Sequence, residues 1–283
     1  MTPIMRAKVG LPKLRIISWN MMQSAPSWAF LLSSSVPDIV LLQEAIKPKD
    51  DVCWSVPALN ESWRIKGNRK EFCAAIVGLT DRYEARLIEP KMLGEEGAGK
   101  LAVSLLGTLS AAEAKTSNHE TILLVSAYST WEYSFPDKKP IFADASAHRL
   151  ISDLSKLING RRKLLLIVAG DWNILYGYGE NGDEYWKDRY NTVFARMETI
   201  GVPFVGPQYP GGTQADPWPS ELPRASLNVP TFRTKRNDPS SATRQLDFVF
   251  ASRELHNRLE VRALNRPEEW GPSDHCRIEI NLW

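Results

Sequence analysis

The chain has 283 residues, of which 43% are hydrophobic, and a formal net charge of +2 at pH 7. This size allows a large core, and the near balance of charge argues against a nucleic-acid coat protein or a polyanion-binding tail. Cys53, Cys73 and Cys276 have no CxxC or zinc-ligand spacing, which argues against a disulfide framework and fits a reducing compartment.

The N-terminal region has no apolar segment of the kind found in a signal peptide. No run in the sequence approaches the ~20 apolar residues that a membrane helix needs. We therefore expect a soluble, cytoplasmic protein that does not associate with membranes.

The predicted strands of the first half end in polar side chains. Residues 14–20 form an apolar run that ends at Asn20, and residues 38–44 form a second run that ends at Glu44. A carboxylate at the end of a buried strand needs a reason, and a metal or an arginine partner is the expected one. Residues 72–77 and 83–88 are predicted to be neighbouring strands, and residues 101–106 another strand.

Two further runs bring polar residues to strand ends. Residues 121–128 have the composition of a fully buried strand that ends at Tyr128. Helical leucine spacing predicts a helix over 141–159, and six apolar residues then lead into Gly-Asp-Trp-Asn. Asp171 and Asn173, two positions apart, share a face of this strand end. An Asx turn would use Asp171 but would not explain Asn173.

The second half contains one predicted helix, over 183–200, and a long segment rich in proline and glycine. That segment, 202–230, is predicted to be either a functional loop or a disordered one. A strand over 244–250 carries Asp247, and strands at 261–264 and 277–282 follow. Because strands recur without an intervening linker, we predict one domain over 1–283, built from two packed sheets.

The residues before the last strand read Gly271-Pro272-Ser273-Asp274-His275. Neighbours on a strand point to opposite faces, but in the turn before a strand Asp274 and His275 can converge on one pocket. The alternative is an ordinary turn in which Ser273 or Asp274 caps backbone groups.

The polar residues at these strand ends resemble, in their order, the endonuclease/exonuclease/phosphatase superfamily. The resemblance rests on the short sequences Trp-Asn, Leu-Gln-Glu, Ala-Tyr, Gly-Asp-Trp-Asn, Leu-Asp-Phe and Ser-Asp-His, which together span nearly the full chain. It is nearest to the apurinic/apyrimidinic endonuclease and DNase I-like branches. It implies the α/β (α+β) class, as a four-layer α/β/β/α sandwich in which two mostly antiparallel sheets are flanked by helices. The site would lie at one end of the paired sheets.

The resemblance also implies metal-dependent hydrolysis of a phosphoester. Such a reaction requires neutralisation of charge on the phosphoryl oxygens and a positioned water, and a divalent cation helps with both. Mg²⁺ or Mn²⁺ takes oxygen ligands and keeps several waters, so a few carboxylates and an amide suffice. We assign metal binding to Glu44, with Asn20 and Asp274 assisting.

The remaining residues of the set receive roles in the chemistry. Asp171 is expected to orient or deprotonate the attacking water, and Asn173 to hold a phosphate oxygen. His275, oriented by Asp247, would stabilise the pentavalent transition state through charge-assisted hydrogen bonds. Tyr128 would donate to the same phosphate.

Two residues bear on the branch within the superfamily. The resemblance to the apurinic/apyrimidinic endonuclease branch implies a second acidic metal ligand at the position of Met22. Methionine departs from that pattern, because a thioether is a poor ligand for Mg²⁺. A tyrosine at position 128 is similar to that same branch, whereas a resemblance to pancreatic-type deoxyribonucleases would imply a histidine at this position. The subfamily therefore stays open.

For the substrate we expect nucleic acid, DNA or RNA, cut by an endonuclease. Arg233, Lys235 and Arg236 precede the Asp247 strand and are the best candidates for contact with a nucleic-acid backbone. Trp218 or Trp270 could stack on bases, although core packing is the simpler explanation for each. The alternative is a phosphatase or phosphodiesterase that acts on inositol phosphates, phospholipid head groups or nucleotides. A non-catalytic binding module is disfavoured, because buried carboxylates are costly to keep without a use.

Overall fold

The computed structural model describes residues 12–33, 36–48, 63–80, 82–95, 101–116, 120–133, 140–158, 165–234 and 237–283. Within these residues, most strands belong to two large sheets, of five and six strands. The five-stranded sheet has the order β14 (Leu259–Leu264), β15 (Arg277–Leu282), β1 (Leu14–Asn20), β2 (Ile39–Ala45) and β3 (Cys73–Gly78). The six-stranded sheet has the order β12 (Phe204–Gly206), β13 (Asp247–Ala251), β11 (Leu166–Asp171), β8 (Thr121–Tyr128), β7 (Leu109–Lys115) and β4 (Glu84–Ile88).

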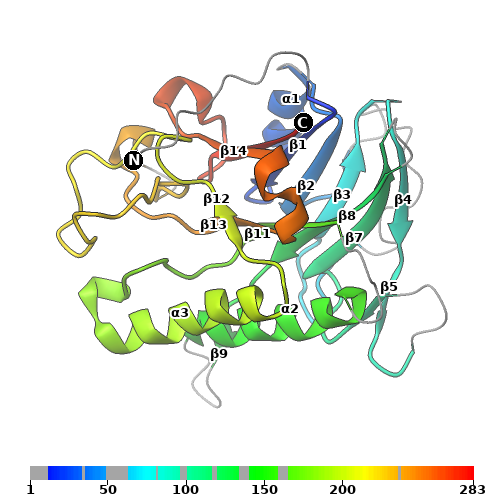
Figure 1. Cartoon of the computed structure of the whole chain (residues 1–283), viewed down its shortest axis with the longest axis horizontal. Helices are drawn as coiled ribbons and strands as arrows, with labels where there is room; N and C mark the ends of the chain where they lie inside the picture. Colours follow the sequence, from blue (N-terminus) through cyan, green and yellow to red (C-terminus); the bar gives the residue numbers. More distant parts are fainter. Residues whose placement is uncertain are drawn as a thin grey trace.

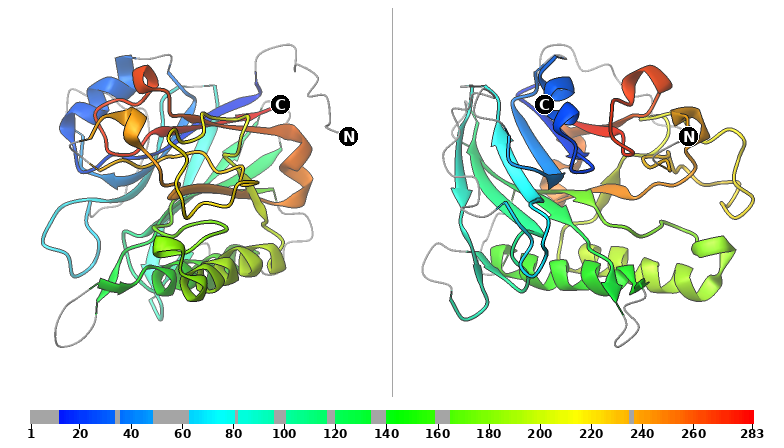
Figure 2. Two further views of the ribbon diagram at one scale, coloured as in Figure 1. Left: turned by 90° about the vertical axis from the view of Figure 1, so that its left-hand side faces the viewer. Right: turned by 180° about the vertical axis from the view of Figure 1, so that it is seen from behind.

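Helices cover the outer faces of the two sheets (Figure 1). Helix α1 (Ala25–Ser33) lies on the five-stranded sheet, and α2 (Ala143–Ile158) and α3 (Glu184–Thr199) lie together on the six-stranded sheet. Figure 2 shows the same layers from two further sides. The predicted four-layer α/β/β/α sandwich is confirmed, as are the helices expected near 141–159 and 183–200.

Alternation along the strands divides the apolar residues between the layers. In β8, Ile122 and Leu124 face the other sheet, whereas Leu123 and Val125 face α2 and α3. The outer face of the five-stranded sheet holds Val40 and other residues that contact α1. Each fully buried aliphatic side chain contributes roughly 1.5–3 kcal/mol relative to its exposed state. The three apolar layers therefore fix which strand residues point into the sandwich.

Shorter elements complete the described part of the chain. They are β5 (Pro90–Met92) with β6 (Leu101–Val103), β9 (Glu132–Tyr133) with β10 (Pro140–Phe142), and the 3₁₀ turns η1 (Glu180–Gly182), η2 (Pro239–Ser241), η3 (Arg253–Arg258) and η4 (Pro267–Glu269). None of the helices in the described residues has the length and apolar character needed to span a bilayer. Cys73 and Cys276 are buried, and Cys53 lies outside the described residues.

Two expectations about the strands were wrong. Residues 72–77 and 83–88 are not neighbouring strands, because β3 pairs with β2 in one sheet and β4 pairs with β7 in the other. The strand expected over 101–106 is limited to β6, and the strand that joins the six-stranded sheet is β7, at 109–115. The chain therefore crosses from one sheet to the other between β3 and β4.

The segment 202–230 is an ordered loop. It contains only β12 as regular structure, but its backbone is tied down, for example by Tyr209 N–H to the Leu227 carbonyl at 2.8 Å. Val229 is fully buried. Of the two alternatives, disorder is therefore excluded for this loop.

Candidate active site

Each large sheet of the described chain contains one parallel pair of strands, and both pairs end at the same site. β1 runs parallel to β2, with Asn20 opposite Gln43, and β8 runs parallel to β11, with Tyr128 opposite Asp171. The carboxyl ends of parallel strands meet at one edge of a sheet. Asp247 joins them because it begins the antiparallel β13, directly opposite Asp171.

A close approach of two backbones positions Asp171. Gly170 lies beside Ala127, and a Cβ atom added to Gly170 would lie 1.8 Å from the Ala127 carbonyl oxygen. No side chain fits in that space, so glycine is required immediately before Asp171. Asp171 is itself 1% exposed.

His275 lies between two buried carboxylates. Its Nδ1 is 2.8 Å from Asp247 Oδ2, and its Nε2 is 3.8 Å from Asp171 Oδ2. The ring of Phe232 covers it, with the ring centroids 5.0 Å apart. All three residues are at most 4% exposed. This cluster is therefore shielded from bulk water.

The charges in this cluster shift the pKa values of its members. Burial lowers the pKa of an imidazole, but the carboxylates of Asp247 and Asp171 outweigh burial and raise the pKa of His275 to about 10. Burial, opposed by His275 and reinforced by Asp247, raises the pKa of Asp171 to about 7. Relative to free side chains, His275 is therefore shifted towards its charged form and Asp171 towards its protonated form.

Glu44 reaches the site through an irregular strand end. The pairing of β2 with β3 shifts register between Leu42 and Ala45, and Glu44 has a left-handed φ of 46°. Simple alternation would place the Glu44 side chain on the face opposite Gln43, which points between the sheets. The bulge instead turns Glu44 towards Tyr128, whose hydroxyl donates to Glu44 Oε1 at 2.9 Å.

Asn20 connects Glu44 with the buried cluster. Its Nδ2 donates to Asp171 Oδ2 at 2.9 Å and approaches Glu44 Oε1 at 3.4 Å. Its Oδ1 accepts the backbone N–H of Met22 at 2.9 Å. In this orientation Asn20 presents hydrogens, and not a ligating oxygen, to the two carboxylates.

Asp274 lies on the turn that leads to His275. Burial raises the pKa of Asp274, the nearby His275 opposes the shift, and the carboxylate of Glu44 adds to it. Ser273 fixes this turn, because its hydroxyl donates to the Asn20 carbonyl at 2.7 Å and accepts the His275 N–H at 3.1 Å. Ser273 therefore caps backbone groups of the turn, as the second interpretation of the sequence proposed. The same turn also carries Asp274 and His275 to the site.

Asn173 has a left-handed φ of 52° and supports Asp171. Its backbone N–H donates to Asp171 Oδ1 at 3.0 Å, which is the Asx turn considered from the sequence. Its side-chain Nδ2 donates to the Ser129 carbonyl at 2.8 Å and to Asp171 Oδ2 at 3.1 Å. Contact with a phosphate oxygen would require this amide to exchange one of those partners.

Comparison with protein-family models and with curated proteins found no match. The solved structures named here each match 95% of this chain. They include the catalytic domain of Xenopus laevis APE2 (TM-score 0.60, 15% identity, 91% of that chain) and the endonuclease domain of TRAS1, a telomere-specific non-LTR retrotransposon (0.56, 16%, 98%). A third is the 3′ phosphatase NExo from Neisseria, bound to a product DNA hairpin (0.53, 16%, 99%). The chain has the endonuclease/exonuclease/phosphatase fold. The fold predicted from the order of the strand-end residues is confirmed.

The basic residues expected to contact substrate are only partly described. Lys235 and Arg236 lie outside the described residues. Arg233 donates from Nη2 to the Ser273 carbonyl at 3.3 Å and from Nη1 to the Asn237 carbonyl. On this endonuclease/exonuclease/phosphatase fold, Arg233 therefore braces the turn that carries Asp274.

The two tryptophans considered for base stacking belong to the protein interior or its margin. Trp270 is 1% exposed, and its Nε1 donates to the Ser273 carbonyl at 3.0 Å. Trp218 is half-buried and donates to the Leu222 carbonyl at 2.9 Å. A stacking role for Trp270 is wrong, because no base can reach its ring.

Gln23 is a site residue that the sequence did not reveal. Its Nε2 donates to Glu44 Oε2 at 2.7 Å, and its backbone N–H donates to the Glu44 carbonyl at 3.1 Å. Met22 and Gln23 both have a left-handed φ of 53°. Neither is glycine or asparagine, the usual residues for that conformation, so the sequence carries no signal for this turn.

Proposed function

We propose that this protein is a divalent-metal-dependent phosphodiesterase, namely a nuclease that hydrolyses the backbone of DNA or RNA. The observation that carries the proposal is the buried imidazolium of His275, held by Asp247 on one side and facing Asp171 on the other. A fixed positive charge in a dry site stabilises the negative charge that develops on phosphate during hydrolysis. Solved neighbours of the same fold include nucleases and a 3′ phosphatase, which supports this chemistry.

The donor set beside this cluster fits a hard divalent cation. Glu44 and Asp274 are close enough for the one carboxylate to raise the pKa of the other, and no lysine or arginine among the described residues forms an ion pair with either. Two carboxylates with room for waters are typical ligands of Mg²⁺ or Mn²⁺. We therefore retain Glu44 and Asp274 as ligands. Asn20 orients Asp171, and its oxygen could join the ligands only after rotation of its amide.

A second set of ligands is disfavoured, because a metal ion there would have to displace a proton from His275. Asp171, Asp247 and His275 offer ligand atoms within 4.8 Å of one another, which by distance alone could hold an ion. His275, with its pKa raised to about 10, carries both ring protons at neutral pH and has no free lone pair. A proton thus occupies the position that a metal would need.

In the proposed reaction, the chain's own residues move one proton and hold charge. Asp171, with its pKa raised to about 7, orients the attacking water and accepts its proton. His275 donates a charge-assisted hydrogen bond to a phosphoryl oxygen, and Asp247 keeps the imidazole in place. Tyr128, whose hydroxyl donates to Glu44, would donate to the same phosphate only after turning its proton away from that carboxylate. A bound divalent cation would supply further neutralisation of the phosphoryl oxygens.

A phosphomonoesterase is the second candidate, because it would use the same residues. The specific support is the 3′ phosphatase among the solved neighbours. In both reactions an alcohol oxygen leaves as water adds to phosphorus. The two functions differ in whether the attacked phosphate carries a second ester, and the loop over 202–230 would then select the substrate. Release of inorganic phosphate separates them.

The test is cleavage of supercoiled plasmid, single-stranded DNA and RNA in Mg²⁺ and in EDTA. The wild type is compared with His275→Ala and with His148→Ala, a control histidine that lies at the α2–α3 contact. We expect metal-dependent cleavage that His275→Ala reduces by about 10²–10³-fold and that His148→Ala leaves unchanged. Full activity in EDTA would remove the metal from the proposal. If no polymer is cleaved while phosphate is released from nucleotides, the phosphomonoesterase replaces the nuclease.

A further inference from the structure

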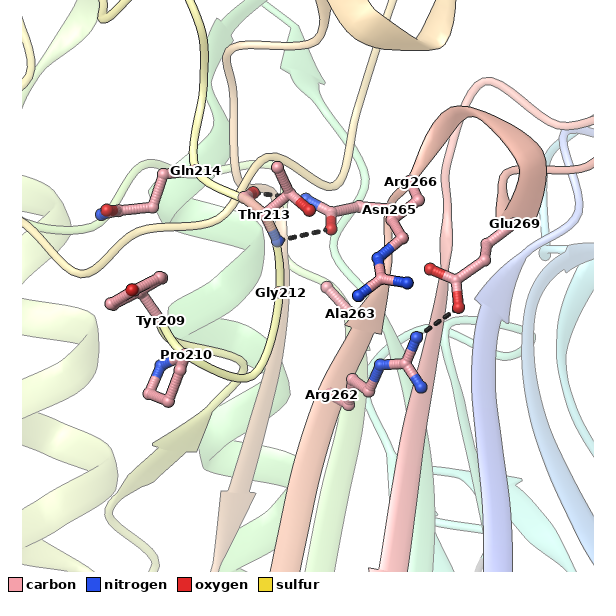
Figure 3. Close-up of a pocket in the computed structure, with 10 residues that line it drawn as sticks. All are labelled: Tyr209, Pro210, Gly212, Thr213, Gln214, Arg262, Ala263, Asn265, Arg266 and Glu269. Carbon is pink, nitrogen blue, oxygen red and sulfur yellow. Dashed lines mark hydrogen bonds and ion pairs between the residues drawn. The ribbon is translucent and has the colours of Figure 1, made fainter.

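A cavity of about 310 Å³ is lined by none of the residues of the catalytic cluster (Figure 3). It is formed by the 209–214 segment on one side and by the end of β14 with the residues after it on the other. Its polar lining includes Thr213, Gln214, Arg262, Arg266 and Glu269. The volume is at the lower end of the range for small-ligand sites.

The walls of this cavity are fixed by hydrogen bonds. The Ala263 N–H donates to the Gly211 carbonyl at 2.7 Å. Asn265 accepts the Thr213 N–H at 2.9 Å and donates from Nδ2 to the Thr213 carbonyl at 2.7 Å. A preformed cavity of this kind loses little conformational entropy when a ligand enters.

The lining carries an excess of positive charge. Figure 3 shows the guanidinium groups of Arg262 and Arg266 near each other on the same wall, with Glu269 beside them. Arg262 forms an ion pair with Glu269, which leaves Arg266 as the uncompensated charge. Arg266 is exposed, and no described carboxylate forms an ion pair with it. Two neighbouring guanidinium groups with one carboxylate are suited to an oxyanion.

One backbone segment separates the cavity from the catalytic cluster. Asn265, on the cavity wall, donates from Nδ2 to the Pro230 carbonyl at 2.9 Å. The next residue, Thr231, accepts the Asp247 N–H on its hydroxyl at 3.1 Å and the Cys276 N–H on its carbonyl at 2.9 Å. The buried 230–231 segment therefore links the wall of the cavity to the strand and the turn that carry Asp247 and His275.

We propose that this cavity is a phosphate-binding subsite in which Arg266 holds a phosphate of the nucleic-acid strand outside the catalytic centre. The polymer as the source of the phosphate rests on the proposed nuclease function. The phosphate-binding chemistry of the cavity does not, since a free nucleotide or inorganic phosphate would use the same guanidinium. Arg262 stays with Glu269 and fixes the wall.

The test measures the affinity of a labelled single-stranded oligonucleotide in EDTA, by fluorescence anisotropy, over a series of salt concentrations. Wild type is compared with Arg266→Ala, with the charge reversal Arg266→Glu, and with Arg253→Ala as control, an exposed arginine paired with Glu198. Loss of one phosphate contact reduces the slope of log affinity against log salt by about 0.7. We expect that change and roughly five- to tenfold weaker binding in Arg266→Ala, a larger loss in Arg266→Glu, and wild-type behaviour in the control.

Hydrolysis of bis(p-nitrophenyl) phosphate, which has no second phosphate for Arg266 to hold, should be unchanged in Arg266→Ala. Equal oligonucleotide affinity and equal salt slope in wild type and both Arg266 variants would overturn the subsite. If the wild type binds no oligonucleotide, the nuclease proposal fails, and the cavity is then tested with inorganic phosphate and AMP by calorimetry. Binding that Arg266→Ala abolishes would support the subsite for free phosphate, and no binding by the wild type would overturn it.

Discussion

The two halves of the candidate site differ in how they hold negative charge. Asp171 and Asp247 are almost fully buried and share the protonated His275 as their counter-charge. Glu44 and Asp274 are half-buried, with hydroxyl and amide donors and no described cationic side chain paired with them. The acidic side chains of one half thus face an imidazole of the protein, whereas those of the other half pair with no described lysine or arginine.

This difference separates two kinds of chemistry at one end of the sandwich. A dry cluster with its own counter-charge suits proton transfer, because pKa values can be shifted far from their ordinary range there. A wetter pair of carboxylates suits a hydrated cation. Asn20, which donates to Asp171 and approaches Glu44, is the contact through which one half can orient the other.

The largest effect is expected from loss of the carboxylate in the buried half. Asp171→Asn keeps the size of the side chain but removes the proton acceptor, so kcat should fall by about a thousandfold. Steady-state rates on plasmid or oligonucleotide measure the change, and Asp216→Asn, on the exposed loop, serves as control. A folded Asp171→Asn protein that keeps a near-wild-type rate would contradict the role of this residue as base.

For the half-buried pair, Glu44 and Asp274, we expect a substitution to weaken metal binding and to leave the proton-transfer step intact. Glu44→Gln retains a hydrogen-bonding side chain but removes one negative charge, so the Mg²⁺ concentration for half-maximal activity should rise by about a hundredfold. A Mg²⁺ titration of activity measures this. The rate at saturating Mg²⁺ should recover most of its wild-type value, and an unchanged titration curve would place the cation elsewhere.

The pH profile sharpens the comparison further. Activity should rise as Asp171 loses its proton near pH 7 and fall as His275 loses its proton near pH 10, and a bound cation would lower both values. Asp247 raises the pKa of His275, so Asp247→Asn should move the alkaline limb to lower pH. Profiles of kcat/KM for the two proteins measure the shift. An alkaline limb at the same pH in both would show that Asp247 does not control His275.

The smallest effect is expected from Gln23, which only orients Glu44. Gln23→Leu removes the donor to Glu44 Oε2, so the affinity for Mg²⁺ should weaken by about tenfold, with little change in the rate at saturation. Gln23→Asn, whose shorter amide cannot reach, should behave like the leucine variant. Metal titrations identical to wild type for both would leave Gln23 without a positioning role.

Regular alternation made most of the site visible in the sequence. Asn20, Tyr128 and Asp171 come at the ends of long apolar runs, and those runs are β1, β8 and β11. Such positions can be predicted because a buried strand rejects polar residues along its length. The order of these endings was enough to indicate the fold.

The parts that the sequence could not predict depend on departures from regular structure. β7 is rich in alanine, lysine and glutamate, which favour helices, yet its small residues lie flat between β4 and β8. Glu44 and Gln23 meet through left-handed backbone at residues that are not glycine. Tertiary contacts, and not local preference, set both features.

The pairing of β1 with β15 also fixes when the site can come into being. Trp19 donates to the carbonyl of His275 across 256 positions of the chain, and β15 lies between β1 and β14. During synthesis one edge of β1 therefore has no partner strand until residues 277–282 have been made. The strand that closes the sheet follows directly after His275. A chain interrupted before His275 would carry Glu44, Asp171 and Asp247 but would lack both the histidine of the proposed site and the strand β15 that pairs with β1.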